Sequence, residues 1–261
     1  MKTLYKKARR VLSRTLRCYL TLRCSLKCYY CSAGIPRISI PPREIHFTEW
    51  VAGINKKNRP TILAGGEPFL YKDFTLLLSK INPHIKVEIY TNLSIIPTPE
   101  IFLDKKLLKP YYNIKRNIQI LASLHDSVEN KLAWIERAKL VIAAGYGFRI
   151  HVIKVGNYIE TCELLKKHLP NIKCNICDDQ TAYIKSQPQI KYPYVNCVTK
   201  GYYYGPDGHR YTCITKMGMR AMRLESINAV EEQITTYSPD CPFFGNCVGC
   251  DNNIEGEVTV E

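Results

Sequence analysis

The sequence lacks the features that would place this protein in a membrane or outside the cell. No apolar run approaches the roughly 20 residues that are needed to span a bilayer. No apolar segment of the export-signal kind follows the basic N-terminus before the first cysteine motif. Acidic residues are also scarce, 23 against 37 Lys and Arg, which leaves a formal net charge of +14. We therefore expect a cytoplasmic protein whose charge favours a polyanionic partner.

Cysteine, by contrast, is abundant. The chain has 261 residues, 46% hydrophobic and 23% charged, which is enough for one large core with a small appendage. Its 12 cysteines would suit a secreted disulfide framework only in a shorter chain with an export signal. We therefore expect reduced thiols that are available to metal. The first 17 residues carry seven Lys and Arg and no acid, and we interpret residues 1–17 as a basic N-terminal arm.

Three cysteines stand close together near the N-terminus, at Cys24, Cys28 and Cys31. The C-x3-C-x2-C spacing lets their thiolates turn inward around one metal centre. Iron–sulfur clusters are normally held by four cysteines, so a loop with only three would leave one iron with an open position. An open position distinguishes catalytic metals from structural ones. For this motif alone, a zinc site or a set of buried cysteines is the alternative.

A second motif follows in the segment TILAGGEP, residues 61–68. An apolar strand runs there into Gly65, Gly66, Glu67 and Pro68. The two glycines would let a ligand lie against bare backbone. The Glu67 carboxylate would suit a positively charged amine.

In their order and spacing, the two motifs resemble the radical S-adenosylmethionine superfamily. The resemblance implies that Cys24, Cys28 and Cys31 hold a 4Fe-4S cluster, whose open iron takes the amino and carboxylate groups of S-adenosylmethionine. The segment from Gly65 to Pro68 would receive that amino group. The implied reaction is reductive cleavage to methionine and a 5′-deoxyadenosyl radical, which takes a hydrogen atom from the substrate. An external flavodoxin or ferredoxin would supply the electron.

Strand and helix patterns alternate six times after the arm, which argues for a parallel α/β sheet. The order matches the partial (β/α)6 TIM-type barrel of the resembled family over residues 18–180, followed by a small cysteine-rich extension over 181–261. The expected strands lie at 18–22, 61–64, 86–90, 117–124, 148–155 and 171–177. The expected helices lie at 48–56, 73–81, 99–108, 128–144 and 158–168.

Polar residues follow the predicted strands directly, where parallel barrels carry their chemistry. Asn92 is one such residue, and we expect it to bind the cofactor. The resemblance implies that Ser123 contacts the ribose and carboxylate of the bound nucleoside, and that Tyr30 lies near its adenine. His125 is a catalytic candidate. An ordinary turn or cap is the alternative role for the residues at the strand ends.

The extension carries cysteines in two groups, spaced C-x10-G-x4-C and C-x5-C-x2-C. It resembles the SPASM or twitch extension of some radical S-adenosylmethionine enzymes, which carries auxiliary 4Fe-4S clusters. The full seven-cysteine SPASM pattern is absent, so a single auxiliary cluster of the twitch kind is the better match, which makes two clusters in the chain. The expected ligands are Cys197, Cys213, Cys247 and Cys250, with Cys241 as a spare. A zinc ribbon is the rival interpretation, because tetrahedral sulfur ligation suits both metals.

Cys174 and Cys177 are three residues apart on the sixth predicted strand, so their side chains should face opposite sides. One thiol would then point into the barrel. A thiol there, for which we take Cys177, could donate a hydrogen atom to a substrate radical. A buried core cysteine is the alternative.

The substrate class stays open at this stage. Three substrate classes fit the resemblance: a nucleic acid undergoing hypermodification, a ribosomal peptide undergoing crosslinking, epimerisation or oxidation, and a small metabolite. The alternative to an enzyme is a non-catalytic module that binds an iron–sulfur cluster or zinc. We expect DNA or RNA, because the chain leaves no room for a leader-peptide domain and its charge would neutralise phosphates. The tyrosines at 202, 203, 204 and 211 would stack on exposed bases or belong to the core.

Overall fold

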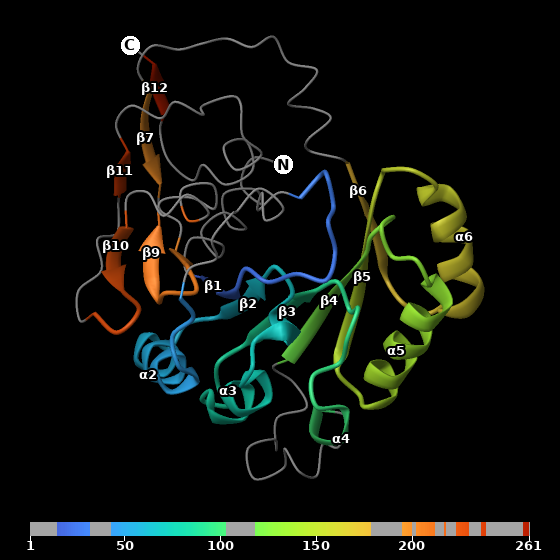
Figure 1. The fold of residues 1–261 in the computed structure, drawn as a ribbon, viewed down its shortest axis with the longest axis horizontal. Helices are drawn as coiled ribbons and strands as arrows, with labels where there is room; N and C mark the ends of the chain where they lie inside the picture. The colour runs from blue at the N-terminus through green and yellow to red at the C-terminus, as the bar shows by residue number, and fades with distance from the viewer. Residues whose placement is uncertain are drawn as a thin grey trace, which may run out of the picture.

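The structure is a computed structural model of the chain, and it describes residues 15–31, 43–102, 118–178, 195–199, 202–211, 217, 223–229, 236–238 and 258–260. Strands and helices alternate through its first part (Figure 1). The strands are β1 (Leu16–Thr21), β2 (Thr61–Gly65), β3 (Val87–Thr91), β4 (Ile118–Leu124), β5 (Gly147–Ile153) and β6 (Cys174–Cys177). The helices are α2 (Phe47–Lys57), the 3-10 turn η2 (Pro68–Leu70), α3 (Phe74–Lys80), α4 (Pro99–Phe102), α5 (Lys131–Ala143) and α6 (Tyr158–His168).

Strands β1 to β6 form a parallel sheet in which sequence neighbours are also spatial neighbours. This order confirms the predicted α/β class and the six-stranded, TIM-type arrangement. Among the described strands the sheet is not closed into a barrel, because β6 lies at one edge and β1 pairs with β8 on the side away from β2. The first strand begins at Leu16, two residues before the prediction. The helix predicted for 99–108 is described only as α4, since residues 103–117 lie outside the described residues.

The helices cover one side of the sheet, and the core lies between the two layers (Figure 1). On β1, Leu16, Cys18 and Leu20 are buried in this core, whereas Arg17 and Tyr19 point to the other side of the sheet. We call that other side the inner face. The alternation of apolar and polar residues therefore decides which side of each strand the helices cover.

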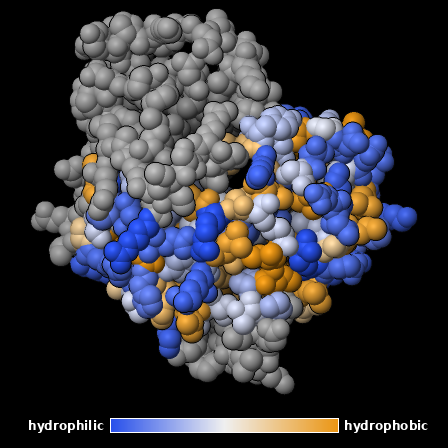
Figure 2. All heavy atoms as spheres, in the orientation of Figure 1, coloured by the Kyte–Doolittle hydropathy of each residue, from blue (hydrophilic) through white to orange (hydrophobic). Residues whose placement is uncertain are grey.

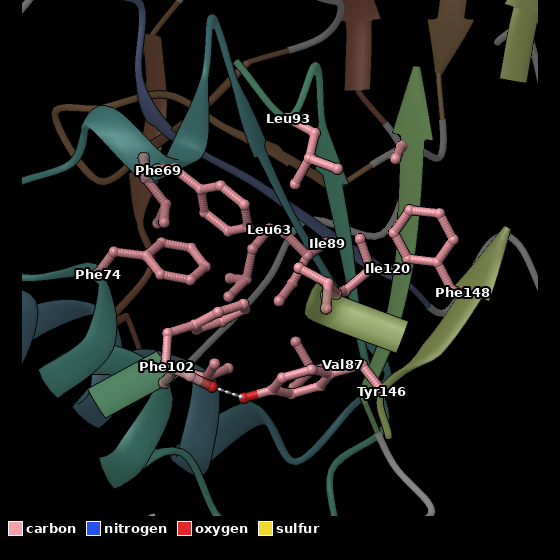
Figure 3. Packing of buried hydrophobic residues seen from close by; sticks show 14 of the residues in the cluster. Leu63, Phe69, Phe74, Val87, Ile89, Leu93, Phe102, Ile120, Tyr146 and Phe148 are labelled. Carbon is pink, nitrogen blue, oxygen red and sulfur yellow. Dashed lines mark hydrogen bonds between the residues drawn. The ribbon is translucent and has the colours of Figure 1, made fainter. Parts of the chain in front are cut away.

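Aromatic rings fill the helix side of the sheet (Figure 3). Phe69 and Phe74 pack edge to face at 5.0 Å between ring centres. Phe102 stacks on Tyr146 at 4.8 Å, and the Tyr146 hydroxyl donates a 2.8 Å hydrogen bond to the Phe102 carbonyl. This bond satisfies the one polar group that Tyr146 brings into the core. Leu63 of β2 lies beside this aromatic group in Figure 3.

The predicted extension contributes strands to two sheets. Strands β8 (Tyr202–Tyr204), β9 (His209–Tyr211) and β10 (Arg223–Ser226) lengthen the main sheet, with β8 parallel to β1. Strands β7 (Val195–Thr199), β11 (Thr236–Ser238) and β12 (Val258–Val260) form a separate antiparallel sheet. The turn predicted at 204–208 is confirmed, because it joins β8 to β9 and Gly208 has a φ of +72°.

Three tyrosines of this hairpin are buried. Tyr203, Tyr204 and Tyr211 are 2%, 0% and 1% exposed. Of the two roles that the sequence left open, the core role is therefore confirmed for these three, because β8 pairs with β1 and β9 pairs with β8.

The surface of the molecule mixes hydrophilic and hydrophobic side chains (Figure 2). Figure 2 shows hydrophobic side chains among hydrophilic ones on the face in view. The exposed large hydrophobic residues of the helices are Leu76, Leu132, Leu140 and Ile159. None of the helices described is at once long enough and apolar enough to cross a membrane.

Candidate active site

The predicted site residues gather where β1 to β4 end. The loop after β1 carries Cys24, Cys28 and Cys31, and the loop after β2 carries the two glycines and Glu67. Asn92 follows β3 directly, and His125 follows β4. Because these strands are parallel neighbours, their carboxyl ends meet at one edge of the sheet, as the sequence predicted.

Local hydrogen bonds shape the cysteine loop. The Cys31 N–H donates to the Cys28 carbonyl at 3.2 Å, and the Leu26 N–H donates to Cys24 Sγ at 3.4 Å. The Cys28 thiol lies 3.2 Å from the Ser127 hydroxyl. Burial raises the pKa of Cys24 to about 11, and the nearby Cys28 and Cys31 add to that rise. Thiolates in such a group would repel one another unless a positive centre joined them.

The glycines let the cysteine loop press against the end of β2. A Cβ atom on Gly65 would lie 2.3 Å from the Thr21 carbonyl oxygen, and one on Gly66 would lie 2.2 Å from that of Arg23. In return, the Gly66 N–H donates to the Thr21 carbonyl at 2.9 Å and the Glu67 N–H to the Arg23 carbonyl at 2.8 Å. Side chains at 65 or 66 would push the loop away. The glycines therefore join the two motifs of the sequence into one site.

Glu67 is enclosed at the centre of this edge, with 0% of its side chain exposed. Its Oε1 accepts hydrogen bonds from the Phe69 N–H at 3.0 Å and the Thr91 hydroxyl at 2.8 Å. Its Oε2 accepts from the Asn92 N–H at 2.7 Å. Burial raises the pKa of Glu67 to about 7, against the effect of these three donors. The carboxylate thus ties the end of β2 to the end of β3.

Asn92 connects this carboxylate to the cysteines. Its side-chain amide donates to Cys24 Sγ at 3.5 Å and to the Ser25 hydroxyl at 3.4 Å. The main-chain carbonyl oxygen of Asn92 accepts a hydrogen bond from the buried indole N–H of Trp134 at 2.7 Å. Helix α5 therefore holds the residue that contacts the cysteine loop.

Tyr30, which lies within the cysteine loop, contacts His125 at the end of β4. Their rings stack at 5.7 Å, and His125 Nδ1 lies 3.3 Å from the Tyr30 hydroxyl. The same hydroxyl accepts from the Asp126 N–H at 3.2 Å. Burial lowers the pKa of His125 to about 4, so its ring is neutral near pH 7. Tyr30 itself is buried, while the neighbouring Tyr29 is 65% exposed.

The remaining predicted residues of the barrel lie on the inner face. Ser123 of β4 is half-buried and stands opposite His151 of β5 in the sheet register. Cys177 of β6 is half-buried on this face, and Cys174 is exposed on the helix side, where it lines a cavity of about 100 Å³ with Cys162. The two thiols of β6 thus face opposite sides, as predicted.

The donor set fits an iron–sulfur cluster in its chemistry, since three thiols share one loop and the nearby acid Glu67 is occupied by its own donors. Within the described part of the chain, no three His, Cys, Asp or Glu side chains converge closely enough to hold a metal ion. The loop therefore brings the thiols near one another without closing them into a ligand set.

The auxiliary set is placed only in part. Cys197 lies on β7, whose side chains are not described. Cys213, Cys241, Cys247 and Cys250 lie outside the described residues. Their ligation stays a prediction.

Three contributors to the site were not found from the sequence. Trp134 was assigned only to a helix, and Ser127 to the loop before it. Arg23 forms a two-bond ion pair with Glu44, 3.0 Å at each contact, which fixes the start of the cysteine loop. Each contact joins residues more than 20 positions apart, so no local pattern signals it.

Comparison with known proteins supports the fold. No protein-family model matches the chain, and no curated protein does. Among solved structures, native anSMEcpe with bound AdoMet is similar over 83% of this chain and 78% of that chain, at 14% identity and a TM-score of 0.55. The structure of anSMEcpe with AdoMet and Kp18Cys peptide gives the same values. BtrN in complex with AdoMet and 2-DOIA covers 82% of this chain and 78% of its own, at 13% identity and a TM-score of 0.47. The similarity to anSMEcpe shows that the two proteins share a fold.

Proposed function

We propose that this chain is a radical S-adenosylmethionine enzyme. The single observation that carries the proposal is the junction of the cysteine loop with the end of β2. There Gly66 and Glu67 donate backbone hydrogen bonds to Thr21 and Arg23, so the C-x3-C-x2-C and GGEP motifs form one site. The fold shared with anSMEcpe, which has been solved with AdoMet bound, supports the same proposal.

Cys24, Cys28 and Cys31 would hold a 4Fe-4S cluster, which when bound supplies the electron for cleavage of S-adenosylmethionine to methionine and the 5′-deoxyadenosyl radical. The segment from Gly65 to Pro68 would receive the amino group of the cofactor. Because three donors already engage the Glu67 carboxylate, this segment would act through its main-chain groups.

The other proposed roles follow from position. Asn92 would orient the Cys24 thiolate through its side-chain amide. Ser123 would contact the ribose from the inner face, and Tyr30 would support the adenine side of the site. His125, neutral and hydrogen-bonded to Tyr30, is a proton carrier for the substrate, and Cys177 is the candidate hydrogen-atom donor. An external flavodoxin or ferredoxin would reduce the cluster.

Cys28→Ala tests the proposal, because loss of one of three ligands leaves an iron without a thiolate. Anaerobically reconstituted Cys28→Ala protein should make no 5′-deoxyadenosine from S-adenosylmethionine under reducing conditions. Cys174→Ala is the matched control, since Cys174 is exposed on the helix side of β6. Undiminished 5′-deoxyadenosine formation by the Cys28→Ala protein would sink the assignment.

A second, auxiliary cluster is proposed for the extension, with Cys197, Cys213, Cys247 and Cys250 as ligands and Cys241 as a spare. Reconstituted protein should then carry about eight irons, and the Cys247→Ala, Cys250→Ala double variant about four. About four irons with one tightly held zinc in the unchanged protein would favour the zinc ribbon instead.

The proposed substrate is a nucleic acid, with DNA as the preferred candidate. The enzyme would modify or rearrange a chemical group of that nucleic acid. The support is the formal net charge of +14 and the seven basic residues of the arm 1–17. Binding to mixed-sequence DNA should fall by orders of magnitude between about 50 and 200 mM salt if roughly six or more phosphates are contacted. It should also weaken when Lys6, Lys7, Arg9 and Arg10 are changed to Ala.

Peptide modification is the second candidate, because anSMEcpe has also been solved with Kp18Cys peptide bound. The two candidates give opposite results in one pair of assays. Absence of DNA binding at low salt, together with stimulation of 5′-deoxyadenosine release by a short peptide, would favour peptide modification.

A further inference from the structure

The inner face of the sheet carries a polar group that the proposed cofactor site does not use. On β5, Phe148 and Ile150 are buried against the helices, whereas Arg149 and His151 are half-buried on the inner face. On β3, the inner-face residue near them is Glu88. Charged side chains are costly on a partly enclosed sheet face unless they are paired or bind something.

Glu88 and Arg149 form an ion pair that reaches across the strand between them. Strands β3 and β5 are separated by β4, and Leu121 of β4 is the register partner of Arg149. Arg149 Nη2 donates to Glu88 Oε1, and the Tyr90 hydroxyl donates to Glu88 Oε2 at 3.3 Å. Glu88 therefore receives a donor on each oxygen and holds the guanidinium over β4.

The guanidinium of Arg149 has further hydrogen-bond donors besides the one that pairs with Glu88. Its Nε is buried and has no hydrogen-bond partner among the described residues. Its side chain is nevertheless 36% exposed, so another part of it is open to a ligand. The guanidinium carries five donors and stays charged at any ordinary pH, so it suits the two oxygens of a phosphate or carboxylate.

The neighbours of Arg149 do not compete for this role. The His151 side chain is engaged with Asn175 of β6 at 3.1 Å. Burial first, and then the charge of Arg149, lowers the pKa of His151, so its ring stays neutral beside the guanidinium.

The polar group also reaches toward the cysteine loop. In the sheet register Arg149 of β5 lies beside Leu121 of β4, and Leu121 lies beside Tyr90 of β3. Two residues after Tyr90, the side chain of Asn92 contacts Cys24 of the cysteine loop. A molecule held by Arg149 would therefore lie on the inner face, close to the strand ends that carry the cysteine loop. That is where a substrate of the proposed reaction has to be.

We propose that Arg149, oriented by Glu88, binds an oxyanion of the substrate, a phosphate or a carboxylate, on the inner face of the sheet. The proposal rests on the proposed function, because it takes the inner face as the substrate side of a radical S-adenosylmethionine site. Arg149 binds the substrate, and Glu88 is a positioning residue.

Two matched pairs of small probes test the proposal on the reconstituted protein with S-adenosylmethionine present. Thymidine 5′-monophosphate is compared with thymidine, and N-acetyltyrosine with N-acetyltyrosinamide, by isothermal titration calorimetry. In at least one pair, the anion should bind tenfold or more tightly than its neutral partner. A preference in the first pair identifies phosphate as the oxyanion, and a preference in the second identifies carboxylate.

Arg149→Gln should abolish the preference, with a tenfold or larger loss of affinity for the anion. Arg149→Lys, which keeps the charge but not the fork, should retain only part of it. Lys139→Gln is the matched control for loss of one positive charge, because Lys139 lies on α5 and pairs with Glu136. Circular dichroism of each variant verifies its fold.

Glu88→Gln separates orientation from charge. If Glu88 only offset the charge of Arg149, removing it would strengthen binding of the anion. If it orients the guanidinium, the variant should bind the anion several-fold more weakly. Stronger binding by Glu88→Gln would overturn the positioning role.

The two proposals fail in different ways. Cys28→Ala tests the cleavage of S-adenosylmethionine, whereas Arg149→Gln tests the binding of the probes. Persistence of cleavage in Cys28→Ala would overturn the proposed function, while probe binding would still report on Arg149. Equal binding of both members in both pairs, no binding by any probe at millimolar concentration, or a preference that survives Arg149→Gln would overturn the oxyanion site.

Discussion

Replacement of Glu67 should destabilise the site more than any surface change, because its carboxylate serves three donors in a fully buried position. Glu67→Ala leaves the N–H groups of Phe69 and Asn92 buried without an acceptor. At about 1–3 kcal/mol for each buried donor, the expected cost is about 2–6 kcal/mol. That is a large part of the about 5–15 kcal/mol by which domains are stable, so this variant is expected to fold poorly.

Glu67→Gln is the measurable variant, since it keeps the shape of the side chain. Its amide oxygen can serve Phe69 and Thr91, but its NH2 group then faces the Asn92 N–H. We expect a loss of about 1–3 kcal/mol in the free energy of unfolding, measured by urea denaturation under anaerobic conditions. Glu136→Gln on the surface of α5 is the control and should change stability by less than about 0.5 kcal/mol.

The effect of Glu67→Gln should also depend on pH. The pKa of Glu67 is raised from 4.5 to about 7, so the folded protein binds this proton more tightly than the unfolded chain. The stability that the proton contributes is complete below pH 4.5 and is lost as the pH rises through 7. The variant lacks this titration, so its deficit relative to the unchanged protein should be larger near pH 5 than above pH 7. A Glu67→Gln protein as stable as the control at both pH values would refute the reasoning.

Two further substitutions test how the strand ends hold the cysteine loop. Gly66→Ala should lower iron loading of the first cluster, because its Cβ would lie 2.2 Å from the Arg23 carbonyl oxygen and displace the loop; iron content equal to that of the unchanged protein would contradict this. Trp134→Phe should cost about 1–3 kcal/mol by thermal unfolding, because the Asn92 carbonyl loses its indole donor, and an unchanged melting temperature would contradict the assigned bond.

The order of elements could be predicted from the sequence because it depends on local patterns. Alternating apolar residues on β1 and β5 and the turn residues between elements act over a few positions, and the six parallel strands follow from them. The cysteine loop and the GGEP segment were placed at neighbouring strand ends for the same reason, since parallel strands in sequence order must end at one edge.

Local patterns could not predict contacts between segments that are far apart in the sequence. From the sequence, the tyrosines at 203, 204 and 211 could form a surface for bases or belong to the core, and only the pairing of β8 with β1 and of β9 with β8 shows that they are buried. Pairing of strands about 186 positions apart leaves no periodic signal in either segment.

The sequence by itself determined which residues could carry the chemistry: three closely spaced thiols, two glycines before an acid, and alternation that orders the strands. Only the tertiary structure decided what those residues touch. It showed that the buried Glu67 carboxylate accepts hydrogen bonds from the Phe69 and Asn92 N–H groups and from the Thr91 hydroxyl, and that the glycines admit the cysteine loop. It also paired Glu88 with Arg149 across β4. These contacts depend on strand register and helix packing, which sum over the whole fold and are not encoded in any short segment.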